Sequence, residues 1–425
     1  MTPDELRQLI LQGENSGVEF KRDDLRPEQL AREVVALANF QGGRVLIGVE
    51  DDGQISGIQR KDLERWVMDA VFGRLVHPQI LPYYEEVPLD EGQRVAVVTV
   101  LAGTAKPYVV RFRQREDIYV RVGSTSQLAS RERQAALFAS GGLLHAELLP
   151  VSGSAIADLD PARLTDYLGR VLSDAVPADE AAWWERLCGL GFMAERAGGP
   201  PVCTIAGLVL FAYRPRRLLR QAGLRWMVFA GDDMDYRALD DTVLDAPLVG
   251  LWTVSGSGQV FQAQPGLLEL TLERARPFIS EESEALVDDL RRERLWHYPL
   301  LAVREALLNA FAHRDWTRPG EVEVVRYGDR LTVTSPGALQ NAMTVAKMLA
   351  GQRSARNPII VEVLRDYGYV EHRGMGVRRR IVPLTRAFSG RDAQFEAAED
   401  FLRLTLPARA GTGGTGPDGN PRDLP

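Results

Sequence analysis

The segment 27–53 constrains the fold more than any other part of the sequence. Pro27 suits the first position of a helix, and apolar residues recur at helical spacing as far as the Gly42-Gly43 pair, where the helix should stop. The next run, RVLIGV at 44–49, predicts a buried strand. Because a helix leads directly into a buried strand, this segment predicts an α+β domain.

The 425-residue chain is long enough for two or three domains. We expect an α+β domain over 1–145, a middle α/β region over 155–290 and a third α/β unit over 291–408. The Gly- and Pro-rich tail 409–425 is predicted to be disordered. In the middle region, the apolar stretch from Thr204 to Ala212 predicts a strand.

The remaining elements are predicted from the same helix and strand periodicities. Predicted helices cover residues 4–12, 61–75, 129–139, 161–172, 179–190, 267–278, 299–312, 343–350 and 358–367. Predicted strands cover residues 18–21, 81–87, 94–101, 108–113, 118–122, 224–230, 322–327, 331–334 and 401–406.

Lysine is scarce, and this excludes one large class of enzymes. Only Lys21, Lys61, Lys106 and Lys347 are lysines among 51 basic residues. A P-loop needs a Gly-Lys pair followed by Ser or Thr, because the lysine contacts the β- and γ-phosphates and the hydroxyl binds Mg²⁺. None of the four lysines follows a glycine. The sequence therefore contains no P-loop, and a P-loop helicase or GTPase is excluded.

Charge and cysteine content exclude further classes. The formal net charge of −7 argues against a uniformly basic nucleic-acid-binding protein, so any electropositive site must be local. Cys188 and Cys203 have neither CxxC spacing nor a nearby histidine pair, which excludes a zinc ribbon or finger. The sequence shows no signal-peptide pattern and no apolar run of membrane-spanning length. We therefore expect a soluble, cytoplasmic protein with no membrane partner.

Acidic residues near the N-terminus form the first candidate site. In GENSGVEFK, strand alternation places Glu19 and Lys21 on one face, and a turn at Gly17 can return Glu14 to their side. Asp51 follows the buried strand and should lie at the end of the sheet. Three carboxylates can hold Mg²⁺ or Mn²⁺, and a lysine can offset developing charge, which metal-assisted phosphodiester cleavage requires. Solvated ion pairs and an ordinary Asp-Asp-Gly turn are the alternative explanation.

Basic residues between 104 and 139 form a second candidate surface, which would bind a polyanion. In the RFRQR run at 111–115 the arginines recur at period two, so they should share one strand face. Tyr108 and Tyr119 lie nearby in the sequence and could stack on bases. A solvated strand face explains the same arginines without any ligand. We assign nucleic-acid binding to Lys106, Arg111, Arg113 and Arg121.

Residues 14–58 resemble the AlbA-type domain of the Schlafen family. The matching motifs are a Glu-x4-Glu-Phe-Lys strand, an Ala-x-x-Asn-x-x-Gly-Gly turn and a Leu-Ile-Gly-Val-x-Asp strand end. In this chain they are GENSGVEFK, VALANFQGG and VLIGVEDDG. The similarity continues through Lys106-Pro107-Tyr108 to YVRVGS at 119–124, and so covers about the first 130 residues.

The Schlafen resemblance implies an activity and a set of site residues. In some members this domain is an RNA endonuclease that cuts structured RNA such as tRNA, while many bacterial relatives are described only as nucleic-acid-binding proteins or transcriptional regulators. Position by position, the three catalytic acids of the family become Glu14, Glu19 and Asp51, which would also hold the metal. Lys21 would stabilise charge beside them. Asn39 and the Gly42-Gly43 turn match as well and are expected to shape the helix-to-strand connection rather than to perform chemistry.

A third candidate site lies on the helix predicted at 299–312. Glu305 and Asn309 are one helical turn apart and His313 is one step further, so all three lie near one helix face. The carboxylate can orient a water, while the amide oxygen can hold Mg²⁺ on a nucleotide phosphate. An ordinary helix surface is the alternative.

This helix resembles the Glu-x-x-x-Asn box of GHKL (Bergerat-fold) ATPases, in the divergent form found after AlbA-type domains in bacterial proteins labelled RecG-like. The matching segments are Tyr298-Pro299, REALLNAFAHRDW, LTVTSPG, Arg356-Asn357-Pro358 and YVEHRGMG at 369–376. The resemblance spans roughly residues 155–406 and implies an α/β sandwich that binds ATP.

The GHKL resemblance also implies individual roles. Glu305 would be the activating base, Asn309 the Mg²⁺ ligand, and Gly374 with Gly376 a loop whose backbone approaches phosphate. Where GHKL enzymes carry an Asp-x-Gly-x-Gly box, this chain has Ser335-Pro336-Gly337, so the aspartate that contacts adenine is missing. We include Gly337 and His313 among the nucleotide-binding residues.

Taken together, these patterns predict a Schlafen-like, nucleic-acid-binding, divalent-metal-dependent endoribonuclease that acts on tRNA-type RNA and has a nucleotide-binding C-terminal region. The expected cofactor is Mg²⁺ or Mn²⁺, with ATP as a second candidate ligand. RNA is the favoured partner, while DNA binding and a homo-oligomer remain open. The alternative is a non-catalytic, ATP- and DNA-binding transcriptional regulator, and a pure ATPase is a third reading.

Overall fold

The computed structural model describes residues 1–141, 145–196, 198–288, 291–340, 343–352, 354–370 and 376–409. The chain divides into two compact units, Met1–Leu144 with Gln340–Ala342, and His145–Leu339 with Met343–Pro425. Both units combine helices with sheets, which confirms the predicted mixed α and β fold class. Within the described residues, no helix has the length and apolar character needed to span a membrane.

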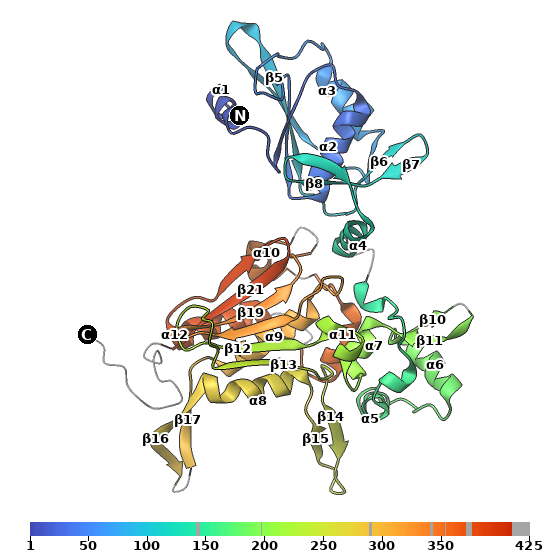
Figure 1. Ribbon diagram of the computed structural model, residues 1–425, viewed down its shortest axis with the longest axis vertical. Coiled ribbons are helices and arrows are strands. Elements are labelled where there is room, and N and C mark those ends of the chain that lie inside the picture. Colours follow the sequence, from blue (N-terminus) through green and yellow to red (C-terminus); the bar gives the residue numbers. More distant parts are fainter. Residues whose placement is uncertain are drawn as a thin grey trace. The chain divides into compact units, whose positions relative to one another are not determined.

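The core of the first unit is a four-stranded sheet in the order β1-β2-β5-β4. Its strands are β1 (Val18–Lys21), β2 (Gly42–Ile47), β5 (Arg94–Leu101) and β4 (Tyr83–Pro88). β1 is parallel to β2, whereas β2, β5 and β4 are antiparallel neighbours. Helix α2 (Pro27–Asn39) connects β1 to β2 and packs on the sheet (Figure 1). The helix-to-strand connection predicted from the sequence is therefore confirmed.

The two glycines that begin β2 permit a close approach of the backbone. Gly42 has a positive φ of 82°, a conformation that favours glycine. A Cβ atom at Gly43 would lie 2.4 Å from the carbonyl oxygen of Gly17. The adjacent Arg44 N–H donates to that same oxygen at 2.8 Å. The glycine pair therefore lets the start of β2 pack directly against the turn that precedes β1.

The other elements of the first unit surround this sheet. They are α1 (Pro3–Leu11), α3 (Leu63–Trp66), η1 (Val67–Phe72), β3 (Val76–His77), η2 (Asp90–Gly92), β6 (Val109–Phe112), β7 (Arg115–Asp117), β8 (Tyr119–Val122), β9 (Thr125–Leu128) and α4 (Arg131–Ser140). The strand predicted at 108–113 is shorter than expected, because Arg113 and Gln114 form the turn between β6 and β7 with positive φ angles of 49° and 64°.

The second unit contains a six-stranded sheet in the order β13-β12-β18-β19-β21-β20 (Figure 1). Its strands are β12 (Leu224–Val228), β13 (Asp240–Leu244), β18 (Val322–Arg326), β19 (Arg330–Pro336), β20 (Gln394–Ala397) and β21 (Phe401–Pro407). β12 and β18 are parallel, and the other neighbours are antiparallel. The domain boundary expected between residues 290 and 291 therefore separates strands of one sheet, with β12 and β13 before it and β18, β19, β20 and β21 after it.

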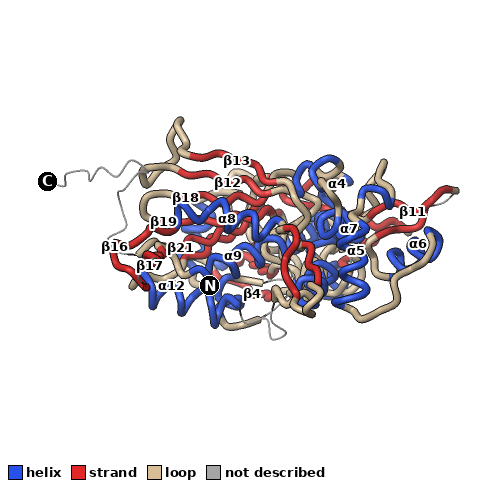
Figure 2. Tube along the Cα trace, turned by 90° about the horizontal axis from the view of Figure 1, so that it is seen from below, coloured by secondary structure: helices blue, strands red, loops and turns tan. Residues whose placement is uncertain are grey.

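Helices α8 (Leu267–Ile279) and α9 (Leu300–Ala312) pack against each other and against strands of this sheet (Figure 2). Both helices end within one residue of their predicted limits. The remaining elements are η3 (Ala146–Leu148), η4 (Ile156–Asp158), α5 (Pro161–Thr165), η5 (Asp166–Val171), α6 (Glu180–Gly189), β10 (Met193–Arg196), β11 (Gly199–Cys203), η6 (Pro215–Arg217), η7 (Arg220–Ala222), β14 (Leu251–Val254), β15 (Val260–Gln264), β16 (Ser280–Asp288), β17 (Arg291–Trp296), α10 (Val345–Leu349), α11 (Pro358–Asp366), η8 (Val377–Ile381) and α12 (Val382–Ser389).

The strand predicted over Thr204–Ala212 is wrong. These residues form helix α7 (Ile205–Phe211), in which every residue is buried. The Thr204 hydroxyl caps the helix by accepting a hydrogen bond from the Gly207 N–H at 3.1 Å. A helix buried on all sides has no polar face, so its sequence has no helical period that would distinguish it from a buried strand.

Candidate functional site

The three predicted acids lie on segments that meet at β1 and β2. Glu14 lies in the turn between α1 and β1, Glu19 lies on β1, and Asp51 follows β2. The turn folds back on β1 through a hydrogen bond from the Asn15 N–H to the Val18 carbonyl oxygen, 3.1 Å long. Since β1 and β2 are parallel neighbours, the chain brings the acids from its first 51 residues together.

Glu14 is half-buried, and its electrostatic surroundings link it to the other two acids. Its Oε1 accepts a hydrogen bond from the Phe20 N–H at 2.8 Å. Burial raises the pKa of Glu14, and the negative charges of Glu19 and Asp51 raise it further, although the Phe20 hydrogen bond and the charge of Lys21 act in the opposite direction. Each of the three carboxylates therefore lies within electrostatic range of another.

Glu19 is the most buried of the three acids, with 6 % of its surface exposed. Lys21 Nζ donates a hydrogen bond to Glu19 Oε1 and another to the Phe20 carbonyl oxygen, the latter at 2.9 Å. On its other side, Arg121 Nη1 lies 2.7 Å from Glu19 Oε2. Both oxygens of the carboxylate are thus held by cations.

The chemistry of this set fits a divalent cation. Carboxylate oxygens are the ligands that Mg²⁺ and Mn²⁺ prefer, and an oxygen that accepts one hydrogen bond keeps a second lone pair. In the described residues, however, no group of three or more His, Cys, Asp or Glu side chains is arranged so that it could hold a metal ion. The hydrogen bonds of Glu14 and Glu19 point their oxygens at protein donors, so cation binding would require side-chain rotation.

The hairpin of β6 and β7 does not present its arginines on one face. Arg111 is opposite Glu116 in the ladder and Arg115 is opposite Phe112, so the side chains of Arg111 and Arg115 point to opposite faces. Arg111 Nη2 pairs with Glu116 Oε1 at 2.7 Å. Arg113 lies in the turn, with its guanidinium 5.0 Å from the centre of the Phe112 ring. The predicted single face of arginines is therefore wrong.

The other two residues assigned to nucleic-acid binding make contacts within the protein. Lys106 Nζ donates to the carbonyl oxygen of Phe40 at 2.7 Å. The Arg121 side chain has no exposed surface and contacts Glu19 and Glu33. A guanidinium buried in this way cannot contact a nucleic acid at the surface, so Arg121 belongs to the interior of the acid site.

Tyr108 is a core residue rather than a base-stacking one, since only 4 % of its surface is exposed. Asn39 holds the backbone of this region in place. Its Nδ2 donates to the carbonyl oxygens of Tyr108 at 2.8 Å and Tyr119 at 2.9 Å, and its Oδ1 accepts from the Tyr108 N–H at 2.7 Å. These bonds tie the end of α2 to the backbone of Tyr108 and Tyr119, rather than to the helix-to-strand connection that Asn39 was expected to shape.

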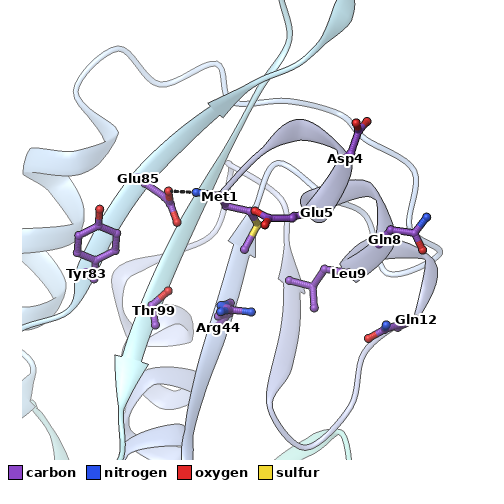
Figure 3. Close-up of a pocket in the computed structure, with 10 residues that line it drawn as sticks. All are labelled: Met1, Asp4, Glu5, Gln8, Leu9, Gln12, Arg44, Tyr83, Glu85 and Thr99. Carbon is purple, nitrogen blue, oxygen red and sulfur yellow. Dashed lines mark hydrogen bonds and ion pairs between the residues drawn. The ribbon is translucent and has the colours of Figure 1, made fainter.

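A surface groove in the first unit is separate from the acids. Figure 3 shows it beside helix α1, next to the ion pair between the Met1 amino group and Glu85, whose N–O distance is 2.6 Å. The residues that line it are Met1, Asp4, Glu5, Gln8, Leu9, Gln12, Arg44, Tyr83, Glu85 and Thr99. None of these belongs to the acid site.

In the second unit, Glu305 and Asn309 of α9 are hydrogen-bonded to each other. Asn309 Nδ2 donates to Glu305 Oε1 at 3.1 Å and to the Glu305 carbonyl oxygen at 2.8 Å. Arg380 Nη1 lies 3.7 Å from Glu305 Oε2. The Gly376 backbone also lies close to this carboxylate: a Cβ atom added at Gly376 would lie 1.7 Å from Oε1. The start of η8 therefore covers the pair.

The other predicted nucleotide-binding residues have different surroundings. His313 is exposed immediately after the last residue of α9. Gly337 has a φ of 112°, and a Cβ atom there would lie 2.4 Å from atoms of both Asp315 and Arg356. Gly374 lies outside the described residues. Of the two glycines expected to approach phosphate, Gly376 is thus the one that the structure places against Glu305.

Two buried polar residues support these sites, although the sequence predicted no individual role for either of them. Glu33 on α2 lies 3.3 Å from Arg121, measured from Oε2 to Nη1. In the second unit, Asn357 Nδ2 donates to the carbonyl oxygens of Ala312 at 3.1 Å and Arg314 at 2.8 Å, which ties the end of α9 to the start of α11. The sequence does contain an indication that Glu33 is buried, because this charged residue lies on the apolar stripe of α2.

Comparison with known families identifies a domain within each unit. Residues 14–130 match the family described as Schlafen, AlbA_2. The first unit contains a Schlafen AlbA_2 domain. The acids at Glu14, Glu19 and Asp51 all lie within the matched residues of this domain, as does Arg121.

The second match confirms the predicted resemblance of the C-terminal region. Residues 320–406 match the family described as "Putative ATP-dependent DNA helicase recG C-terminal". This segment runs from just before β18 to near the end of β21. Helix α9 precedes it, so the Glu305–Asn309 pair lies outside the matched residues.

Two solved structures are similar to the chain. The DIP2311 protein from Corynebacterium diphtheriae is 24% identical over 93% of this chain and 76% of its own, with a TM-score of 0.43. The N-terminal domain of a protein from Nitrosomonas europaea, described as related to the ATP-dependent DNA helicase RecG, is 22% identical over 30% of this chain and 92% of its own, with a TM-score of 0.24. No curated protein matches the sequence.

Proposed function

We propose that the protein binds nucleic acid and that its Schlafen AlbA_2 domain cleaves structured RNA of the tRNA type, with Mg²⁺ or Mn²⁺ held by Glu14, Glu19 and Asp51. One observation carries the proposal: Glu14 is half-buried in the turn before β1, close to Glu19 on that strand, and the charges of Glu19 and Asp51 both act on it. A half-buried carboxylate beside two others is stabilised when a cation binds between them.

The residues around the metal would have distinct tasks. A bound divalent ion supplies charge neutralisation at the phosphate. Lys21 holds Glu19 through Oε1 and adds a compact positive charge beside the acids. Phe20 orients Glu14 through its N–H. In the second unit, we propose that the Glu305–Asn309 pair and the RecG-like region serve a nucleotide such as ATP. The family match supports this for residues 320–406, and the hydrogen bond between Asn309 and Glu305 supports it for the pair.

The proposal is tested by incubating the full chain with a tRNA pool in the presence of Mn²⁺ or of a chelator. We expect Mn²⁺-dependent cleavage that falls at least about tenfold in Asp51→Asn, because this change removes one ligand charge without changing size. Asp52→Asn is the matched control, since Asp52 is the adjacent exposed acid and its Oδ1 accepts the Gln54 N–H within the turn.

Two outcomes would contradict the proposal. Equal cleavage by Asp51→Asn and the parent would show that the site is elsewhere. Salt-sensitive retention of DNA with no RNA cleavage under any divalent metal would instead favour the regulator, since contacts to phosphate weaken as salt rises.

The raised pKa of Glu14 predicts how cation binding depends on pH. Metal binding needs the ionised carboxylate, so protons compete with Mn²⁺. Because the pKa of Glu14 is above its usual value, Mn²⁺ affinity should fall as the pH is lowered, starting at a higher pH than for an ordinary glutamate. Calorimetric titration of Mn²⁺ at several pH values measures this. Glu14→Gln should have weak affinity and a flatter pH dependence, and an unchanged profile would contradict the assignment.

A further inference from the structure

A single buried arginine connects the parts of the acid site. Arg121 on β8 donates from Nη1 to Glu19 Oε2 at 2.7 Å and from Nη2 to the Asn15 carbonyl oxygen at 2.6 Å. Its side chain is completely inaccessible to solvent. The guanidinium therefore joins β1 to the turn that precedes it.

Arg121 contacts the chain neighbours of both Glu14 and the residue that donates a hydrogen bond to Glu14. Asn15 is the neighbour of Glu14 in the chain, and Glu19 is the neighbour of Phe20, whose N–H donates to Glu14 Oε1. β1 is an edge strand of its sheet. If Arg121 released the Asn15 carbonyl, the turn could move away from β1, and the Glu14–Phe20 hydrogen bond would weaken with it.

Glu33 holds Arg121 in this position. It is almost completely buried, with 1 % of its surface exposed, and its Oε2 faces Arg121 Nη1 at 3.3 Å. Arg32 contacts the other oxygen at 3.0 Å, and the Ser126 hydroxyl donates to Oε2. A buried guanidinium is costly without a carboxylate partner, and Glu33 supplies a partner that is not one of the three predicted ligands.

We propose that Arg121 is a positioning residue of the three-acid site, and that Glu33 keeps it in place. By holding Glu19 and the Asn15 carbonyl at once, Arg121 sets the spacing between Glu14 and Glu19. The inference rests on the proposed function where it concerns the cation, and on the hydrogen-bond geometry alone where it concerns the turn.

A role of Arg121 as a charge and a role as a geometric link predict different results for a lysine substitution. The network contains four carboxylates, Glu14, Glu19, Glu33 and Asp51, and three cations, Lys21, Arg32 and Arg121. If Arg121 acted only through its charge, Arg121→Lys would change little. If Arg121 instead acts by holding two separate acceptors at once, Arg121→Lys should not keep the turn in place. A single ammonium group then replaces two separated N–H groups of the guanidinium.

The test compares full-length Arg121→Lys with the parent protein by amide hydrogen exchange in the absence of metal. We expect the Phe20 amide to exchange at least about tenfold faster in the variant, and Mn²⁺ to bind at least about tenfold more weakly by calorimetry. Arg94→Lys is the control, because Arg94 pairs with Glu86 at an exposed position of the same unit. It should match the parent in both measurements. Thermal unfolding followed by circular dichroism verifies that each variant is folded.

Glu33→Gln provides a second variant, since glutamine keeps an acceptor for Arg121 but loses the charge. It should change both measurements in the same direction by a smaller factor. Parental Phe20 exchange in folded Arg121→Lys would overturn the proposal, whatever the cation affinity. If exchange rises but the parent protein cleaves no RNA, the cleavage proposal fails while the positioning role of Arg121 stands.

Discussion

Glu19→Gln is expected to lower Mn²⁺-dependent RNA cleavage roughly 100-fold, the largest effect that we predict for the first unit. Glutamine has nearly the same size as glutamate and can still accept hydrogen bonds, but it is a neutral and weaker ligand for a hard cation. Glu19 is also the acid in contact with both Lys21 and Arg121. Its replacement therefore removes a metal ligand and leaves two cations with one partner fewer.

The measurement is a single-turnover cleavage assay at saturating Mn²⁺, with thermal unfolding recorded on the same samples. Some loss of stability is expected, because Arg121 remains buried with Glu33 as its only carboxylate contact. Glu116→Gln is the matched control, since it also removes a carboxylate from an arginine pair of this unit but at an exposed position. Cleavage by folded Glu19→Gln at the parental rate would rule out this site.

Gly376→Ala is expected to destabilise the second unit by about 1–3 kcal/mol, the usual cost of inserting a methyl group into a packed site. Gly376 has helical backbone angles, φ −57° and ψ −47°, at which alanine is normally more favourable than glycine by about 1 kcal/mol. A Cβ atom there would nevertheless lie 1.7 Å from Glu305 Oε1 and 2.2 Å from its Cδ. To make room, the Glu305 carboxylate must move away from Asn309 Nδ2 and Arg380 Nη1, and the loss of these contacts should outweigh the helix propensity.

Urea denaturation measures this effect, and two further variants identify its cause. Gly189→Ala is the control, because Gly189 ends helix α6 and a Cβ atom there would have open space around it; it should be neutral or slightly stabilising. Adding Glu305→Ala to Gly376→Ala removes the conflicting carboxylate, so the methyl group should then cost less than it does beside Glu305. Undiminished stability of Gly376→Ala would contradict the packing of η8 on α9.

The parts of the fold that could be predicted from the sequence are those determined by neighbours in the chain. Helix α2 was predicted because Pro27 marks its start and its apolar residues face the sheet. The placement of Glu14, Glu19 and Asp51 on neighbouring segments was predictable for the same reason, since a turn, a strand and a second strand end lie within the first 51 residues. Local periodicity and turn residues contain this information.

The surroundings of Arg121 could not be predicted in this way. Its contact with Glu19 joins residues 102 positions apart. Alternation along a strand indicates which face of the sheet a side chain lies on, but not which charged residue of a distant segment contacts it. Arg113 was misplaced for a different reason, because a left-handed turn at a non-glycine residue has no dependable sequence signal. Both errors concern arginine, whose long side chain suits an exposed face and a buried ion pair alike.

The long separation between Glu19 and Arg121 has a consequence for synthesis on the ribosome. The acids emerge first, because all three lie in the first 51 residues, whereas Arg121 follows 102 positions after Glu19. A growing chain that has not yet exposed β8 lacks the contact that fixes the turn of Glu14. If the protein cleaves RNA as proposed, this order would keep the nascent chain inactive until β8 has emerged and Arg121 can reach the turn.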